Sequence, residues 1–148
     1  MCCVAQVSVQ PVQWAGSLVR TTLLNAGMKI VIELSAEVQQ GWHVYGVAQS
    51  PGGPTPLRVT LDANDFVQVA GVTSGTVPEK RHDAAFDLDT ELYEKSFKLD
   101  QPLTINQDPG AGRNLVPVSV RFQTCNHRVC LPRRTVNVSV PIEISQSN

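Results

Sequence analysis

Three long stretches of this sequence alternate apolar and polar residues with a period of two, which is the pattern of a β-strand with one buried face. They cover residues 28–38, 116–122 and 136–144. Turn-forming Gly, Pro, Asn and Asp separate a set of shorter apolar runs at 4–12, 42–47, 57–61, 66–72, 92–99 and 103–106. No segment shows a helical period with capping residues. The pattern therefore predicts an all-β chain folded as an antiparallel β-sandwich.

Length and charge limit the kinds of function to consider. A chain of 148 residues predicts one domain with a substantial core. Its 12 Lys and Arg against 13 Asp and Glu leave a formal net charge of -1, which gives no reason to expect nucleic acid or an anionic membrane surface as a partner. No apolar run has membrane-spanning length. We expect a monomer, since nothing in the sequence calls for more copies.

The first five residues differ from the rest. Cys3 and Ala5 place small residues at the third-last and last positions of this segment, as in a signal-peptidase site. We therefore interpret residues 1–5 as the remnant of a secretory signal or an added start, and 6–148 as the single domain. Cys2 and Cys3 are assigned to no site.

Two further cysteines, Cys125 and Cys130, lie between the second and third alternating stretches, with four residues between them. If those stretches form a hairpin, its connection carries both thiols. Closing so short a loop stabilises a fold by only about 2 kcal/mol in the chain-entropy model, and a bridge between distant strands would contribute about twice as much. The spacing therefore fits a redox switch on a rigid frame as well as a structural bridge, and both interpretations stay open.

Basic side chains surround this pair. Nearby positive charge lowers a cysteine pKa and favours the thiolate, which is the attacking species in disulfide exchange. The plainer interpretation is that they are solvated loop charges. His127 adds a third soft ligand to the two cysteines for zinc or copper, but no fourth ligand stands at a recognisable spacing, so we expect no metal site. The basic residues are Arg121, His127, Arg128, Arg133 and Arg134.

The stretch 78–90 is a polar segment with one large aromatic residue, Phe86. We predict a long loop here, and long loops in compact domains tend to be functional or mobile. A lone Phe most often packs back into the core. The alternative is a flap whose ring covers a site elsewhere in the molecule.

A collinear set of motifs points to a family. The most specific of them is an aromatic-Gln-x-Cys and Cys-x-Pro arrangement near the C-terminus. From about residue 18 to 144, the set resembles the periplasmic N-terminal domain of DsbD, a membrane protein that carries reducing equivalents from the cytoplasm to periplasmic thiol proteins. The motifs are Gly41-Trp42-His43-Val44-Tyr45, Pro51-Gly52-Gly53-Pro54-Thr55-Pro56-Leu57, Phe86 with Tyr93, Phe122-Gln123-Thr124-Cys125, and Cys130-Leu131-Pro132.

The resemblance implies an immunoglobulin-like antiparallel β-sandwich with Cys125 and Cys130 as its redox pair. Phe86 matches the aromatic of the cap loop, which shields that pair from adventitious oxidation or exchange. Other positions match aromatic or acidic residues close to the site, namely Tyr45, His43 and Asp83. Two departures affect pKa tuning and cap geometry: the loop between the cysteines is tighter than in some members, and Ala84 and Ala85 precede Phe86.

By this resemblance the chain is a protein-disulfide reductase domain of the periplasm, attached to a membrane section in the full-length protein. A thioredoxin-like domain would donate electrons. A periplasmic disulfide isomerase or a cytochrome-maturation thioredoxin would accept them, and no cofactor or metal would be needed. Cys130 would engage partners and Cys125 would resolve the mixed disulfide. The alternative is an immunoglobulin-like module that binds proteins and carries a purely structural disulfide.

Overall fold

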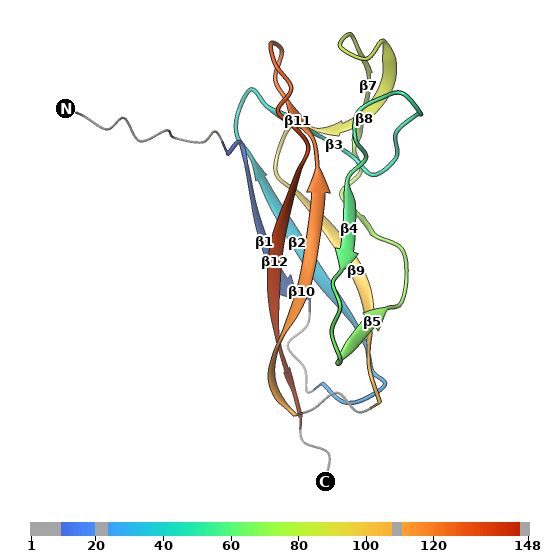
Figure 1. Cartoon of the computed structure of the whole chain (residues 1–148), viewed down its shortest axis with the longest axis vertical. Coiled ribbons are helices and arrows are strands. Elements are labelled where there is room, and N and C mark those ends of the chain that lie inside the picture. The colour runs from blue at the N-terminus through green and yellow to red at the C-terminus, as the bar shows by residue number, and fades with distance from the viewer. Residues whose placement is uncertain (1–9, 20–23, 108–110, 146–148) are drawn as a thin grey trace, which may run out of the picture.

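The chain forms a sandwich of two antiparallel sheets with a third sheet of shorter strands at one end (Figure 1). The computed structural model describes residues 10–19, 24–107 and 111–145, and these contain strands and no helix. One main sheet has the order β1-β2-β9-β5, and β6 also pairs with β9. Its strands are β1 (Val12–Leu18), β2 (Lys29–Val38), β9 (Phe97–Ile105), β5 (Val67–Val69) and β6 (Ser74–Gly75).

The second main sheet has the order β12-β10-β4. Strands β10 (Gly112–Phe122) and β12 (Arg134–Ile144) pair along their whole length, from Gly112 with Ile144 to Phe122 with Arg134. The short strand β4 (Arg58–Leu61) covers part of the other edge of β10. The predicted hairpin of the two long C-terminal strands is therefore confirmed, and the segment with both cysteines connects them.

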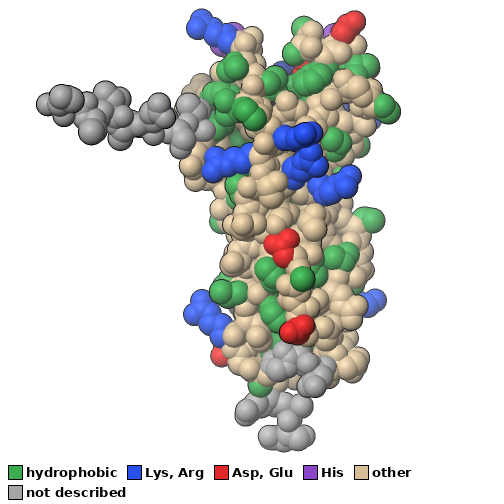
Figure 2. Space-filling model, in the orientation of Figure 1, with side chains coloured by type: hydrophobic (Ala, Val, Ile, Leu, Met, Phe, Trp, Pro, Cys, Tyr) green, Lys and Arg blue, Asp and Glu red, His purple; other side chains and the backbone are tan. Residues whose placement is uncertain are grey.

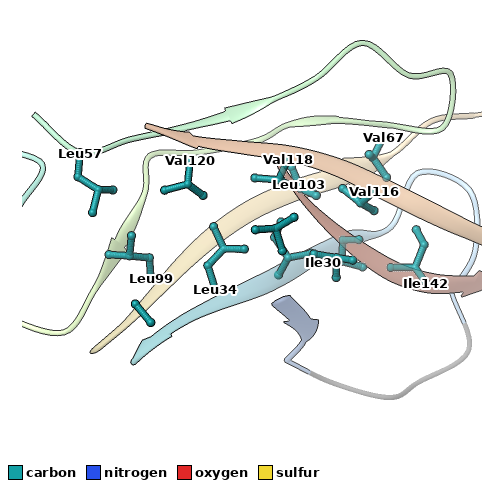
Figure 3. Close-up of a cluster of buried hydrophobic side chains, with 14 of the residues drawn as sticks. Ile30, Leu34, Leu57, Val67, Leu99, Leu103, Val116, Val118, Val120 and Ile142 are labelled. Atoms are coloured by element: carbon teal, nitrogen blue, oxygen red, sulfur yellow. The ribbon is translucent and has the colours of Figure 1, made fainter. Parts of the chain in front are cut away.

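The core lies between the two main sheets, where the alternating residues predicted from the sequence point inward. Burial alternates along β2, β9, β10 and β12, as expected for strands with one solvated face. Figure 3 shows side chains of β2 and β9 facing those of β10 and β12. This core is a single cluster that includes Ile30, Leu34, Leu99, Leu103, Val116, Val118, Val120 and Ile142.

The third sheet caps one end of the sandwich and has the order β11-β3-β8-β7. Its strands are β11 (Thr124–Cys125), β3 (His43–Tyr45), β8 (Leu88–Tyr93) and β7 (Glu79–Asp83). Where this sheet meets the main core, Tyr93 of β8 stacks on Phe97 of β9 with ring centroids 3.9 Å apart, and both belong to the core cluster. Trp14 contacts both Phe97 and Phe122 at centroid distances of 5.6 and 5.5 Å. These packed rings join the end sheet to the main core.

The fold confirms an all-β, immunoglobulin-like antiparallel β-sandwich and corrects the sequence prediction in two places. The stretch 78–90 is not a long loop, because most of it belongs to the hairpin of β7 and β8. Its first strand escaped notice because nearly all its side chains are exposed and charged, so it lacks apolar alternation. The apolar run 92–99 is also not one strand, since it spans the end of β8, a turn and the start of β9.

Two predictions concern residues at the ends of the chain. Most of the run 4–12 and the interpreted signal remnant at 1–5 lie outside the described residues, and strand β1 begins at Val12. Over the described ranges, no helix combines the length and apolar character needed to cross a membrane.

Candidate redox site

The cysteine segment forms a small hairpin of its own at the end of the sandwich. Cys125 ends β11 and lies opposite His43 of β3, so its backbone belongs to the end sheet. The chain then turns and returns, and Cys125 and Cys130 face each other as an isolated antiparallel bridge. The Leu131 amide donates to the Thr124 carbonyl at 2.9 Å, which closes the hairpin below the two cysteines.

Asn126 shapes the turn between the cysteines. Its backbone amide donates to the Val129 carbonyl at 2.8 Å. Its side-chain Oδ1 accepts hydrogen bonds from the amides of Arg128 at 2.8 Å and Val129 at 2.7 Å. Asn favours turns because its side chain satisfies backbone amides in this way. The tight loop is thus organised by local hydrogen bonds as well as by the sulfur bridge.

Cys125 and Cys130 form a disulfide whose Cα atoms lie 4.0 Å apart. The two ends of this bond differ in environment. Cys125 is 1% exposed and belongs to the buried residues, whereas Cys130 is exposed. A thiolate from another protein can therefore approach the Cys130 side of the bond more easily than the Cys125 side.

Cys125 packs in a second buried cluster, separate from the main core. Tyr45 and Leu92 complete the cluster, and the half-buried Phe86 packs against it. The Phe86 ring meets the Tyr45 ring edge-to-face, with centroids 5.8 Å apart and an interplanar angle of 90°. This is a favourable geometry for an aromatic pair. The buried sulfur thus lies under a layer of aromatic and aliphatic side chains.

The turn of the β7–β8 hairpin carries Phe86 to this place. Asp83 and Leu88 form the last strand pair, and the turn between them contains Phe86. Asp83 Oδ1 accepts a hydrogen bond from the Ala85 amide at 2.8 Å. Asp87 has a φ of 53°, in the left-handed region that Asp tolerates better than most residues. Local turn geometry therefore sets where the ring can lie.

A chain of hydrogen bonds joins His43, Tyr45 and Asp83 beside the cluster. The Tyr45 hydroxyl donates to Asp83 Oδ2, and its oxygen lies 3.0 Å from His43 Nε2. Since the hydroxyl has one proton and gives it to the carboxylate, His43 donates through Nε2–H. The chain ties β3, in the end sheet, to the base of the turn that holds Phe86.

Burial shifts the pKa of two groups in this chain. Burial raises the pKa of Tyr45 well above its ordinary range, and the hydrogen bond and charge of Asp83 act in the same direction. Burial lowers the pKa of His43 below 6.5, although the charge of Asp83 opposes that change. Both shifts favour neutral side chains, which suits a partly desolvated site.

A family model for the N-terminal part of the thiol:disulfide interchange protein DsbD matches residues 16–141. The chain belongs to this family. No curated protein sequence matches it significantly. The matched region contains both cysteines and every other residue of the site described above, so this DsbD-type domain holds a disulfide within the segment that matches a thiol:disulfide interchange family.

The structure brings together the site residues expected from the sequence of this DsbD-type domain. Phe86, Tyr45 and Cys125 are in one cluster, and His43 and Asp83 join through Tyr45. Arg121 lies on β10 opposite Arg58, on the outer face of the main sheet.

Sequence reasoning gave no role at the site to Leu92 or to Gln123, although Gln123 belongs to the aromatic-Gln-x-Cys motif. Leu92 is 1% exposed and completes the cluster with Cys125. The Gln123 carbonyl accepts from the Tyr45 amide at 3.2 Å, and its side-chain Oε1 accepts from the Thr55 amide at 2.8 Å. The alternation along β8 could have indicated Leu92, whereas the role of Gln123 depends on contacts across the fold.

The metal interpretation of Cys125, His127 and Cys130 meets a chemical obstacle in this state. Both sulfurs are bonded to each other, so neither is available as a thiolate ligand. Across the described ranges, no group of three His, Cys, Asp or Glu side chains could hold a metal ion.

Proposed function

We propose that this domain relays reducing equivalents in the periplasm through the Cys125–Cys130 pair. The observation that supports the proposal best is the unequal exposure of the two cysteines in a short-loop disulfide. One sulfur is open to a partner while the other is held in a rigid, buried frame. The membership in the DsbD N-terminal family supports the same chemistry.

Reduction of the domain proceeds in two exchange steps. A thiolate of a thioredoxin-like donor attacks Cys130 Sγ, the Cys125–Cys130 bond breaks, and Cys125 leaves as a thiolate that takes up a proton. The second thiolate of the donor then attacks the donor sulfur of the mixed disulfide, and Cys130 leaves. The donor ends as a disulfide and the domain as a dithiol, so two electrons have moved.

Transfer onward uses the same two sulfurs in reverse. The Cys130 thiolate attacks the disulfide of an oxidised client, such as a disulfide isomerase or a cytochrome-maturation thioredoxin. Cys125 then attacks Cys130 in the mixed disulfide, restores the internal bond and releases the client as a dithiol. In this scheme Phe86 covers the buried sulfur between encounters and moves aside when a partner docks.

Cysteine-to-serine variants test the proposal. Cys130→Ser should abolish reduction of a disulfide client, and Cys125→Ser should trap a mixed disulfide that mass spectrometry can detect. Both variants should stay folded, because closing this short loop contributes only about 2 kcal/mol. Loss of the fold in Cys130→Ser, with transfer chemistry surviving in refolded material, would contradict the relay and favour a structural bridge.

The reduction potential separates the relay from the structural alternative. A structural disulfide in a protein-binding module should have a potential below about -300 mV, whereas a relay should be more oxidising. Equilibration of the domain with glutathione buffers, read by thiol alkylation, measures this value.

A further inference from the structure

Three arginines line one hollow on the outer face of the β12–β10–β4 sheet. The hollow has a volume of about 380 Å³. Its lining consists of residues 49–56 together with Arg58, Arg121 and Arg133, and includes no Asp or Glu. Figure 2 shows Lys and Arg side chains gathered over the upper half of this face. We call this feature the arginine hollow.

Strand register brings two of these charges together. Arg58 of β4 and Arg121 of β10 are direct cross-strand partners, and both are exposed. Like charges directly opposite one another destabilise a sheet. In the part of the chain that the structure describes, no ion pair involves Arg58, Arg121 or Arg133. Because these three arginines have no counterion in the described fold, they are free to bind an anionic group on another molecule.

The arginine hollow is held in place and adjoins the redox hairpin. On the loop side, the Gly53 amide donates to the Ser50 carbonyl at 3.1 Å, and the Thr55 amide donates to Gln123 Oε1 at 2.8 Å. Gln123 stands two residues before Cys125. On the other side, Arg133 stands three residues after Cys130, a distance that the chain spans in at most about 11 Å. A typical protein interface covers about 800 Å² per partner, so a protein joined to Cys130 also reaches the hollow.

We propose that the arginine hollow docks carboxylates of an acidic segment on the proteins that exchange thiols with Cys130. The inference rests on the proposed relay, because it names how the partners of that site are recognised. Arginine suits this task, since its planar guanidinium binds a carboxylate in a bidentate manner, through two parallel hydrogen bonds. Complementary charge beside a reactive group also raises the rate of productive encounter.

Two peptide measurements test the inference. The first is fluorescence anisotropy of a labelled, cysteine-free peptide rich in glutamate, mixed with the oxidised domain. The second is the rate at which the reduced domain reduces a peptide disulfide flanked by glutamates, compared with a twin flanked by glutamines. At low salt we expect the domain to bind the acidic peptide and to reduce the glutamate disulfide on the order of tenfold faster than its twin. Near 1 M salt, where the screening length is about 3 Å, the preference should vanish.

The decisive variant is the triple substitution of Arg58, Arg121 and Arg133 by Gln. A matched control removes the same charge elsewhere through Lys29→Gln, Lys98→Gln and Arg113→Gln, all on exposed positions. The first variant should lose the binding and the preference for glutamate, and the control should keep both. Thermal unfolding should show that the arginine variant is at least as stable as the wild type, because it removes like-charge repulsion.

Each contrary result has a distinct meaning. If both triple variants lost binding and the glutamate preference equally, net charge alone would explain the effect and the inference would be wrong. Equal reduction of both peptides by the wild type, without anisotropy binding, would refute the arginine hollow while leaving the relay intact. Binding through the arginines without reduction of either peptide would refute the relay and retain the hollow. Vesicles of phosphatidylglycerol test a membrane instead. If the arginine variant lost only its binding to these vesicles, the hollow would bind a membrane surface and the inference would be wrong.

Discussion

Replacing Phe86 by Ala tests whether this ring shields the buried sulfur. In the structure the ring packs on the cluster of Tyr45, Leu92 and Cys125 and meets Tyr45 edge-to-face. Such ring pairs contribute about 0.5–1.5 kcal/mol beyond area burial. Full burial of a Phe side chain contributes about 1.5–3 kcal/mol, and Phe86 is only partly exposed, so most of that applies.

Together these contributions hold the ring in its packed position by about 3 kcal/mol. If the ring must move before a small disulfide reaches the pair, its removal should speed the reaction by up to about 100-fold, since about 1.4 kcal/mol corresponds to a tenfold change. The assay follows the reduced domain with excess oxidised glutathione and quantifies the remaining thiols by mass spectrometry. Phe86→Leu, which keeps part of the apolar contact, should give an intermediate rate.

Phe66→Ala is the matched control for this experiment. Phe66 is also half-buried, but it packs against the main core. The Phe66→Ala substitution should lower the stability of the domain without changing the rate at which the folded domain reacts with oxidised glutathione. Equal acceleration by Phe66→Ala would mean that general loosening exposes the thiols. An unchanged rate in Phe86→Ala would refute the shielding role of the ring.

Three further predictions follow from the described contacts. Tyr45→Phe removes the hydroxyl between His43 and Asp83 and should lower the free energy of unfolding by about 1 kcal/mol or more, because polar groups lose their partner; an unchanged urea midpoint would contradict it. Burial lowers the pKa of His43, so the unfolded state binds this proton at higher pH, and the associated stability, complete above pH 6.5, should be lost as the pH falls towards the folded pKa. His43→Gln should remove this loss of stability at low pH. If the free energy of unfolding of the variant and of the wild type changed with pH in the same way, the role of His43 would be refuted. Gly16→Ala would place a Cβ 2.6 Å from Val140 Cγ2 and should destabilise by about 1–3 kcal/mol, as measured by urea unfolding; equal stability would show that β1 and β12 can separate at no cost.

The sandwich was predictable because its main strands have one buried face and one solvated face. Alternation along β2, β10 and β12 follows directly from that geometry and is visible in the sequence. Strand β7 was not predictable in this way. It lies at the edge of the end sheet with nearly all its side chains in solvent, so pairing with β8, and not burial, makes it a strand.

The sequence by itself determined that Cys125 and Cys130 lie together, because two residues on a short connection between paired strands cannot separate far. Only the tertiary structure decided that the two cysteines differ in solvent exposure. Pairing of β11 with β3 draws Cys125 under Tyr45 and leaves Cys130 at the surface. The packing of Phe86 against the cluster that contains Cys125, and the position of Arg58 beside Arg121, likewise depend on strand register between distant segments, which local residue patterns do not encode.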